Sequence, residues 1–152
     1  QVEPTLFATN ILQIATPPHN PKKIKSLADL TAPGVKLVVC APQVPCGNAA
    51  VQVAKKAGIS LTPVSEEQSV TDVLGKVRAD EADAGLVYVT DVVGAGDEVL
   101  GIEFPEAAAV VNEYPIVALK NSKNVKAAQA FAAFIASPEA RGVFKAAGFG
   151  QP

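Results

Sequence analysis

The chain has 152 residues, enough for one domain with a real core or for two small lobes. Hydrophobic residues make up 49% and charged residues 18%, a balance typical of a globular protein and not of a disordered one. The net charge of −2 argues against a nucleic-acid-binding surface, and no apolar run approaches the ~20 residues that span a bilayer. The sequence opens without Met or a signal peptide, so we expect it to come from a longer chain.

Apolar periodicity and turn residues divide the chain into alternating strands and helices. Strands are predicted, in chain order, over residues 5–16, 35–40, 61–64, 84–89, 99–104 and 114–119. Helices are predicted over residues 26–30, 46–57, 69–79, 90–94 or 90–96, 124–136 and 138–147. Residues 35–40 form a continuous apolar run, which is typical of a central parallel strand. The alternation predicts an α/β fold with a mostly parallel sheet flanked by helices.

The stretch 35–50, VKLVVCAPQVPCGNAA, indicates a buried strand, a tight loop and a helix that begins at Cys46. The first turn of a helix has unpaired N–H groups and the positive end of the peptide dipoles, which together favour an anion. A second helix start of this kind lies at Ser69-Val70-Thr71. Neither of these two loops contains Lys or Arg, so an anion there would be held by neutral donors.

Tyr88 ends another buried strand, and its hydroxyl is a third candidate donor. Ligands of open α/β sheets bind beyond the carboxyl ends of strands, where all three elements are expected. Neutral donors suit a fully ionised oxyanion and discriminate against an anion that still carries a proton. The alternative is that both loops are ordinary strand-to-helix connections and that Tyr88 is a packing residue.

Cys40 and Cys46 are six positions apart, and the sequence leaves their chemistry open. In an exported protein they would form a disulfide that stiffens the loop; otherwise they are two small buried thiols. Cys46 could also be a low-pKa nucleophile, but such a residue needs a base, and the single His19 lies far away in a Pro-rich loop. One His and two Cys are too few for a structural zinc site, and no cofactor is predicted.

Five stretches resemble the extracytoplasmic molybdate-binding proteins of ABC transporters, which have the type II periplasmic binding protein fold. They are VPCG (44–47), SEEQSVTDVLGKV (65–77), ADAGLVYVTD (82–91), EYPIVAL (113–119) and FKAAGF (144–149). The resemblance implies that a tetrahedral oxyanion, molybdate or tungstate, is held between two lobes by N–H and hydroxyl groups, without a countercharge and without catalysis. Carried onto this sequence, it places backbone donors at Cys46 and Val70 and a hydroxyl donor at Tyr88.

The resemblance also implies a division of the chain. Residues 1–14 would be the first crossing strand and residues 15–113 would be lobe two, an α/β unit. Residues 114–152 would be the returning crossing strand and the C-terminal helices of lobe one. The family's N-terminal half-lobe, which supplies two Ser ligands, has no counterpart in this sequence. We therefore expect a fragment that keeps about half of the binding site.

An ABC transporter permease is the implied partner, and the implied location is extracytoplasmic, with any lipid anchor in the longer parent. In such a fragment the helix at 124–136 loses its packing partner. Its apolar stripe then predicts either folding back onto lobe two or a homodimer through the C-terminal helices; the stripe is Val125, Ala128, Phe131 and Ile135.

Three alternatives remain open from the sequence. Sulfate or another small anion is an alternative ligand, because the three donor positions do not distinguish doubly charged tetrahedral anions. An enzyme with Cys46 as its nucleophile is an alternative from another class, and a disulfide to Cys40 would rule it out. The ligand-sensing domain of a regulator shares the fold, but the sequence has no basic patch or DNA-binding segment.

Overall fold

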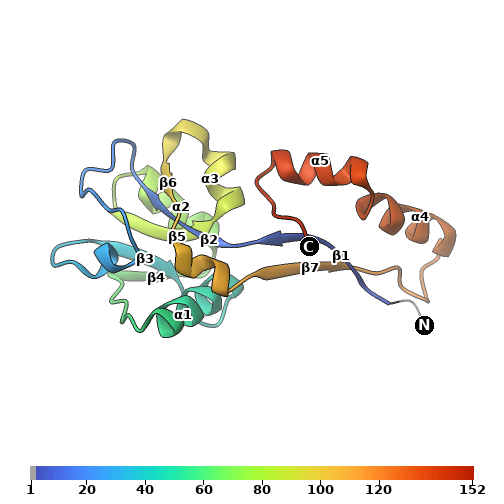
Figure 1. Ribbon diagram of the computed structural model, residues 1–152, viewed down its shortest axis with the longest axis horizontal. Coiled ribbons are helices and arrows are strands. Elements are labelled where there is room, and N and C mark those ends of the chain that lie inside the picture. The colour runs from blue at the N-terminus through green and yellow to red at the C-terminus, as the bar shows by residue number, and fades with distance from the viewer. Residues whose placement is uncertain (1–2) are drawn as a thin grey trace. The chain divides into compact units, whose positions relative to one another are not determined.

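The computed structural model describes residues 3–152, which separate into two compact units. Unit 1 contains residues 3–10 and 112–152, so its two parts come from opposite ends of the chain. Unit 2 is the continuous segment Ile11–Val111. The elements of both units are labelled in Figure 1. The backbone therefore passes between the units twice, once before unit 2 in the sequence and once after it.

Unit 2 is built on a five-stranded sheet in the order β4-β3-β5-β2-β6. Its strands are β2 (Leu12–Thr16), β3 (Leu37–Cys40), β4 (Ser65–Glu67), β5 (Ala84–Tyr88) and β6 (Leu100–Ile102). β3 pairs in parallel with β4 and β5, whereas β2 pairs antiparallel with β5 and β6. The α/β class is confirmed, but the sheet is mixed and not mostly parallel. The sheet is mixed because the chain enters unit 2 at the end of β5, where Leu12 pairs with Tyr88. Strand β2 then runs against the direction of β5.

Helices cover both faces of this sheet (Figure 1). Helix α1 (Pro45–Ala57) lies on one face, and α2 (Val70–Arg78) and α3 (Val89–Ala95) lie on the other. Right-handed connections require this arrangement, because α1 leads outward from β3 to β4 while α2 leads back from β4 to β5. Three short 3-10 helices complete the unit: η1 (Ala28–Thr31), η2 (Gly96–Glu98) and η3 (Pro105–Ala109).

Local chemistry fixes the ends of these helices. Gly58, with a φ of 67°, ends α1 in the left-handed conformation that glycine adopts readily. Ser69 caps α2, and its side-chain oxygen accepts a hydrogen bond from the N–H of Asp72 at 3.2 Å. Helix α2 then packs closely on β5, because Val73 is fully buried against Gly85. An added Cβ on that glycine would stand 2.6 Å from a Val73 methyl group.

The core of unit 2 fills the space between the sheet and its helices. Burying each of its large aliphatic side chains stabilises the fold by about 1.5–3 kcal/mol. The largest fully buried side chains are Leu12, Ile14, Ile24, Leu27, Leu37, Leu86, Val38, Val53, Val73, Val77, Val87 and Thr16.

Three strand predictions differ from the structure. The alternating run 5–16 divides at Ile11 into β1 (Thr5–Asn10) and β2, which belong to different sheets. The strand expected at 61–64 is absent, and β4 forms just after it. Pro63 explains the shift, since it has no N–H to donate to a neighbouring strand. The last strand, β7 (Asn112–Ile116), begins and ends earlier than expected.

Unit 1 consists of the antiparallel pair β1 and β7 with two helices, α4 (Val125–Ile135) and α5 (Pro138–Ala146). The chain end joins this ribbon at Gly150, whose carbonyl oxygen accepts from the N–H of Thr9 at 3.0 Å and whose N–H donates back at 2.8 Å. Four rings then form a cluster with centroids 5.1 to 6.3 Å apart: Phe7, Tyr114, Phe144 and Phe149. Each such pair contributes about 0.5–1.5 kcal/mol beyond burial.

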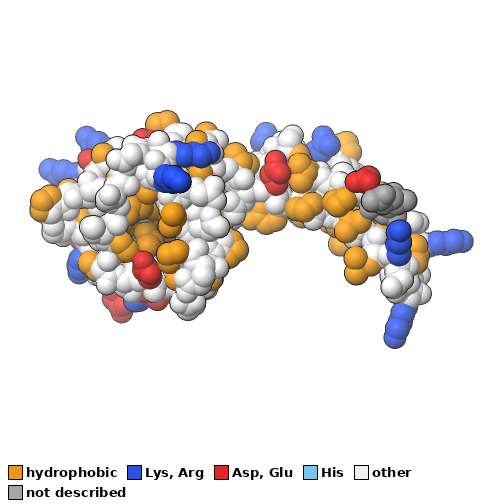
Figure 2. Space-filling view, turned by 90° about the horizontal axis from the view of Figure 1, so that it is seen from below, with side chains coloured by type: hydrophobic (Ala, Val, Ile, Leu, Met, Phe, Trp, Pro, Cys, Tyr) orange, Lys and Arg blue, Asp and Glu red, His pale blue; other side chains and the backbone are white. Residues whose placement is uncertain are grey.

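Unit 1 leaves much of its apolar surface in solvent. Helix α4 contains no buried residue, and Phe131, Leu119 and Val143 are 60%, 70% and 69% exposed. Apolar side chains gather on this unit on the face seen in Figure 2. A two-stranded ribbon is too small to cover them. Among residues 3–152, no helix combines the length and the apolar character needed to cross a bilayer.

Candidate functional site

A short loop joins β3 to α1 and carries its own hydrogen bonds. Strand β3 ends at the buried Cys40. The N–H of Ala41, the next residue, donates to the carbonyl oxygen of Glu67 at the end of β4, at 2.7 Å. The N–H of Val44 donates to the carbonyl oxygen of Ala41 at 3.1 Å, which closes a turn before α1 begins at Pro45. The loop is thus tied to the sheet before the helix starts.

The first turn of α1 presents backbone donors. The N–H of Asn48 makes the first intrahelical bond, to the carbonyl oxygen of Val44 at 2.9 Å. The N–H groups of Cys46 and Gly47 come before it, so the helix geometry supplies them with no acceptor. No side chain caps this end of α1, and its first turn contains no acidic residue. The positive end of the helix therefore meets no carboxylate of its own first turn.

The structure joins Cys40 to Cys46 by a disulfide, with the two Cα atoms 5.7 Å apart. Both residues are buried, with exposed fractions of 2% and 5%. The sequence left open whether these cysteines form a disulfide or remain two buried thiols, and the structure contains the disulfide. A bonded sulfur is not a thiolate, so the alternative of a Cys46-dependent enzyme has lost its nucleophile.

The start of α2 lies beside the start of α1. In the parallel pairing of β3 with β4, Cys40 is the partner of Glu67. Helix α2 begins three residues later, at Val70. The N–H of Asp72 donates to the side chain of Ser69, which caps α2. The N–H of Val70 lies earlier in the same turn, where the helix geometry supplies no acceptor. The register of β3 and β4 thus brings the two helix starts to one edge of the sheet.

Tyr88 reaches the same edge from the other side of β3, at the end of β5. Its ring is buried, with 9% of the residue exposed, and its N–H donates to the carboxylate of Asp91 at 2.8 Å. Burial raises the pKa of Asp91, and the hydrogen bond from Tyr88 partly opposes that rise. The fold therefore places Cys46, Val70 and Tyr88 at one edge of the sheet.

An acidic side chain at this edge is neutralised by a lysine. The Nζ atom of Lys76 lies 2.6 Å from a carboxylate oxygen of Glu67 and donates to the hydroxyl of Ser65 at 3.1 Å. The hydrogen bond from Lys76 is the main reason that the pKa of Glu67 is lowered, and the same bond raises the pKa of Lys76. The pair cancels the charge of Glu67, while the carboxylate of Asp72 remains in the first turn of α2, where it accepts from the hydroxyl of Ser69.

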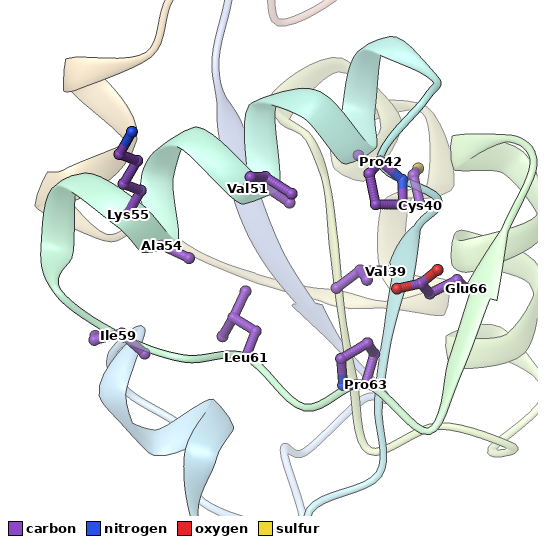
Figure 3. Close-up of a pocket in the computed structure, with 12 residues that line it drawn as sticks. Val39, Cys40, Pro42, Val51, Ala54, Lys55, Ile59, Leu61, Pro63 and Glu66 are labelled. Carbon is purple, nitrogen blue, oxygen red and sulfur yellow. The ribbon is translucent and has the colours of Figure 1, made fainter.

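A pocket of about 300 Å³ lies beneath α1 and is distinct from these donors in character. Its walls are mostly aliphatic, with Lys55 at one end and Glu66 at the other (Figure 3). An apolar wall offers no hydrogen bonds to an ion that must leave water, so this pocket does not suit an oxyanion. The side chains that project into it include Val39, Val51, Ala54, Leu61 and Pro63.

Within residues 3–152, no cluster of three or more His, Cys, Asp or Glu side chains is placed to hold a metal ion. What the edge offers is a set of candidate hydrogen-bond donors: backbone N–H groups from two helix starts, and Tyr88 at the end of the neighbouring strand β5. Such a set can bind and orient an anion.

The sequence matches the family of bacterial extracellular solute-binding proteins over residues 2–150, and the chain belongs to this family. It is 49% identical over 149 residues to the molybdate-binding protein ModA of Mycobacterium tuberculosis H37Rv. That match covers 98% of this chain and 57% of the relative. The chain thus spans a little over half the length of the curated relatives that it matches first.

Solved structures give the same fold. A substrate-binding domain assigned to a molybdenum ABC transporter of Clostridium difficile has a TM-score of 0.77 at 26% identity, covering 98% of this chain and 66% of that one. The periplasmic molybdate-binding protein of Azotobacter vinelandii has a TM-score of 0.76 at 21% identity, covering 98% and 68%. The second likeness shows the fold alone, which is that of the periplasmic binding proteins.

Sequence reasoning missed two features of the edge. One is the close backbone approach at Gly47, although the small residue inside VPCG was a visible signal. The other is the bond from the N–H of Ala41 to the carbonyl oxygen of Glu67, which joins the two loops. No local pattern reports that bond, because its partners are 26 positions apart and meet only through strand pairing.

Proposed function

We propose that this chain is the C-terminal portion of an extracytoplasmic solute-binding protein that captures molybdate or tungstate for import through an ABC permease. Two observations support the proposal: the chain is 49% identical to ModA over 149 residues, and two helix starts and Tyr88 follow neighbouring strands of one sheet. The proposed donors are the backbone N–H groups of Cys46 and Val70 and the hydroxyl of Tyr88. The chain acts by binding alone and is not an enzyme.

The chemistry of the edge supports a fully ionised oxyanion. Molybdate, tungstate and sulfate bring only acceptors, which N–H and O–H groups satisfy directly. An anion that carries a proton would leave that proton facing another donor, and the mismatch costs affinity. Size, and not charge, must separate molybdate from sulfate, which is the second candidate ligand.

The expected affinity follows from the number of donors. Three charge-assisted hydrogen bonds at about 1.5 kcal/mol each give about 4–5 kcal/mol, or a Kd of about 1 mM. A longer parent that adds donors from the opposite lobe would bind more tightly by about tenfold for each further 1.4 kcal/mol.

The same proposal assigns roles to the rest of the chain. Residues 15–113 are lobe two, residues 1–14 are the first crossing strand, and residues 114–152 are the returning strand and the last helices of lobe one. Lobe two corresponds to unit 2, whose bounds Ile11–Val111 lie a few residues earlier at both ends. Closure of two lobes around the oxyanion would present a surface to the permease. We place the parent protein outside the cytoplasm, with a lipid anchor as one form of attachment. The exposed apolar face of α4 supports a homodimer of this chain.

The test is a titration of the ¹⁵N-labelled chain followed by amide chemical shifts. Molybdate and tungstate should shift the Cys46 and Val70 amide signals in a saturable way, with a Kd of about 1 mM. The signal of Val51, further along α1, is the internal control. Tyr88→Phe removes only the hydroxyl and should weaken binding by about tenfold. Tighter binding of phosphate or of an organic ligand, or no saturable shift with molybdate, would refute the proposal.

A further inference from the structure

We propose that the Cys40–Cys46 disulfide is a positioning device that holds the first turn of α1 in the orientation that binds the oxyanion. The inference rests on the proposed function and gives a structural cause for the affinity of the first turn of α1 for the oxyanion. Cys46 carries both the disulfide and one proposed backbone donor, so the covalent bond acts on the binding turn itself.

The start of α1 lacks the support that the start of α2 has. Ser69 fixes α2 by accepting a hydrogen bond from a first-turn N–H. Val44, at the same place before α1, makes no side-chain cap. The disulfide takes over this task, because it joins the second residue of α1 directly to Cys40 at the end of β3. That strand lies inside the sheet, between β4 and β5, so its end is a fixed point.

The hydrogen bonds of the loop order only its strand side. They run from the N–H of Ala41 to the carbonyl oxygen of Glu67 and from the N–H of Val44 to the carbonyl oxygen of Ala41. Neither bond involves a first-turn N–H of α1. Without the disulfide, oxyanion binding would have to order this turn, and the lost backbone entropy would reduce affinity. With the disulfide, that ordering is already complete before the ligand arrives.

The position of the bond favours a permanent constraint over a reversible switch. Cys40 and Cys46 are 2% and 5% exposed, so reductants in solution have little access to the sulfurs. A buried disulfide persists in an oxidising compartment, which fits the location proposed for the parent protein. Its effect is therefore built into the folded chain at all times.

The test compares the wild-type chain with the double variant Cys40→Ala/Cys46→Ala in the molybdate titration. The Val70 amide is the reporter, because neither substitution changes that residue. The variant should bind molybdate about fivefold or more weakly. Leu30→Ala is the matched control: it removes a buried side chain from η1, so it lowers stability, but it lies outside the loop and should keep the wild-type Kd.

The outcomes separate the two proposals. If the wild-type chain does not bind molybdate, the proposed function fails. If the wild type and the double variant bind equally well, the disulfide inference fails and the function stands. If the double variant does not fold, hydrogen exchange of the ligand-free wild type decides. Exchange of the Asn48 amide, which makes the first hydrogen bond of α1, as slow as that of the capped Asp72 amide supports the inference; faster exchange of Asn48 with the disulfide intact overturns it.

Discussion

Gly47 and Ala41 approach each other so closely that no side chain fits between them. A Cβ built on Gly47 would stand 1.8 Å from the carbonyl oxygen of Ala41 and 2.6 Å from that of Cys40. Both atoms belong to the backbone, so neither can swing aside as a side chain could. The absence of a side chain at position 47 thus lets the first turn of α1 lie directly on the end of β3.

Gly47→Ala should therefore displace the first turn of α1. We expect a loss of stability of about 1–3 kcal/mol from overpacking and a weakening of molybdate binding by about tenfold. Urea denaturation and the amide titration measure the two effects. Gly75→Ala is the control, because its added Cβ meets nothing within 4 Å inside α2. That change should stabilise the chain by about 0.5–1 kcal/mol. Equal stabilities for both variants would contradict the close approach.

Ser69→Ala should destabilise α2, because it removes the side-chain oxygen that accepts from the N–H of Asp72. Loss of an N-cap of this kind costs about 1 kcal/mol. The measurement is the urea midpoint, and Ser69→Asn is the control, since Asn retains a capping oxygen. If Ser69→Ala left the midpoint unchanged while Ser69→Asn lowered it, the cap would not have the role described.

Lys76→Met should make the free energy of unfolding less dependent on pH under acidic conditions. The hydrogen bond from Lys76 lowers the pKa of Glu67 below its ordinary value of 4.5. A lowered pKa contributes stability above pH 4.5 that is lost as the pH falls through the folded-state value. The free energy of unfolding of the wild type should thus fall more steeply below pH 4.5 than that of the variant. The difference should shrink in high salt, because 34% of the Lys76 side chain is exposed.

Asp91→Asn should have the opposite pH dependence. Burial raises the pKa of Asp91 above its ordinary value of 3.8, so ionisation of this group opposes folding. Stability of the wild type is therefore reduced as the pH rises through the folded-state pKa. Asn keeps an oxygen that can accept the N–H of Tyr88 and does not ionise, so the variant should gain relative stability between pH 3.8 and pH 7. An advantage that shrank across this range would refute the assignment.

Phe131→Lys should prevent self-association through α4. Phe131 is 60% exposed on a helix without buried residues, and a second copy of the chain would remove that surface from water. Light scattering during size-exclusion chromatography should give a dimer for the wild type and a monomer for the variant. Lys126→Ala is the control, since it changes an exposed position of the same helix without adding charge. A monomeric wild type would rule out the homodimer.

Local signals predicted much of unit 2 before any tertiary contact was known. The apolar run 35–40, the glycine stop at Gly58 and the cap at Ser69 each depend on neighbours a few positions away. The helix start at Cys46 and the strand end at Tyr88 were also local signals, with which the resemblance in VPCG and in ADAGLVYVTD agreed, and the fold places both residues at one edge. Their role as ligands of the oxyanion stays a prediction.

Local signals failed where distant partners decide. Nothing in residues 5–16 indicates that the strand divides at Ile11 and joins two sheets, because the division depends on pairing with β7 on one side and β5 on the other. The antiparallel pairing of β2 with β5 also depends on partners far away in the sequence. Pro63 is the exception, since its missing N–H was readable in advance and argued against a strand at 61–64.

Which residues start and end helices, and which apolar runs become buried, was set by chemistry within single turns of the chain. Tertiary structure alone decided that Cys40 and Cys46 meet as a disulfide, that Gly47 rests on the carbonyl of Ala41, and that the helix starts share one edge. The physical reason is the distance along the sequence over which each interaction acts. Caps and periodicity act over three or four residues, whereas strand order and backbone contact depend on how the whole core packs.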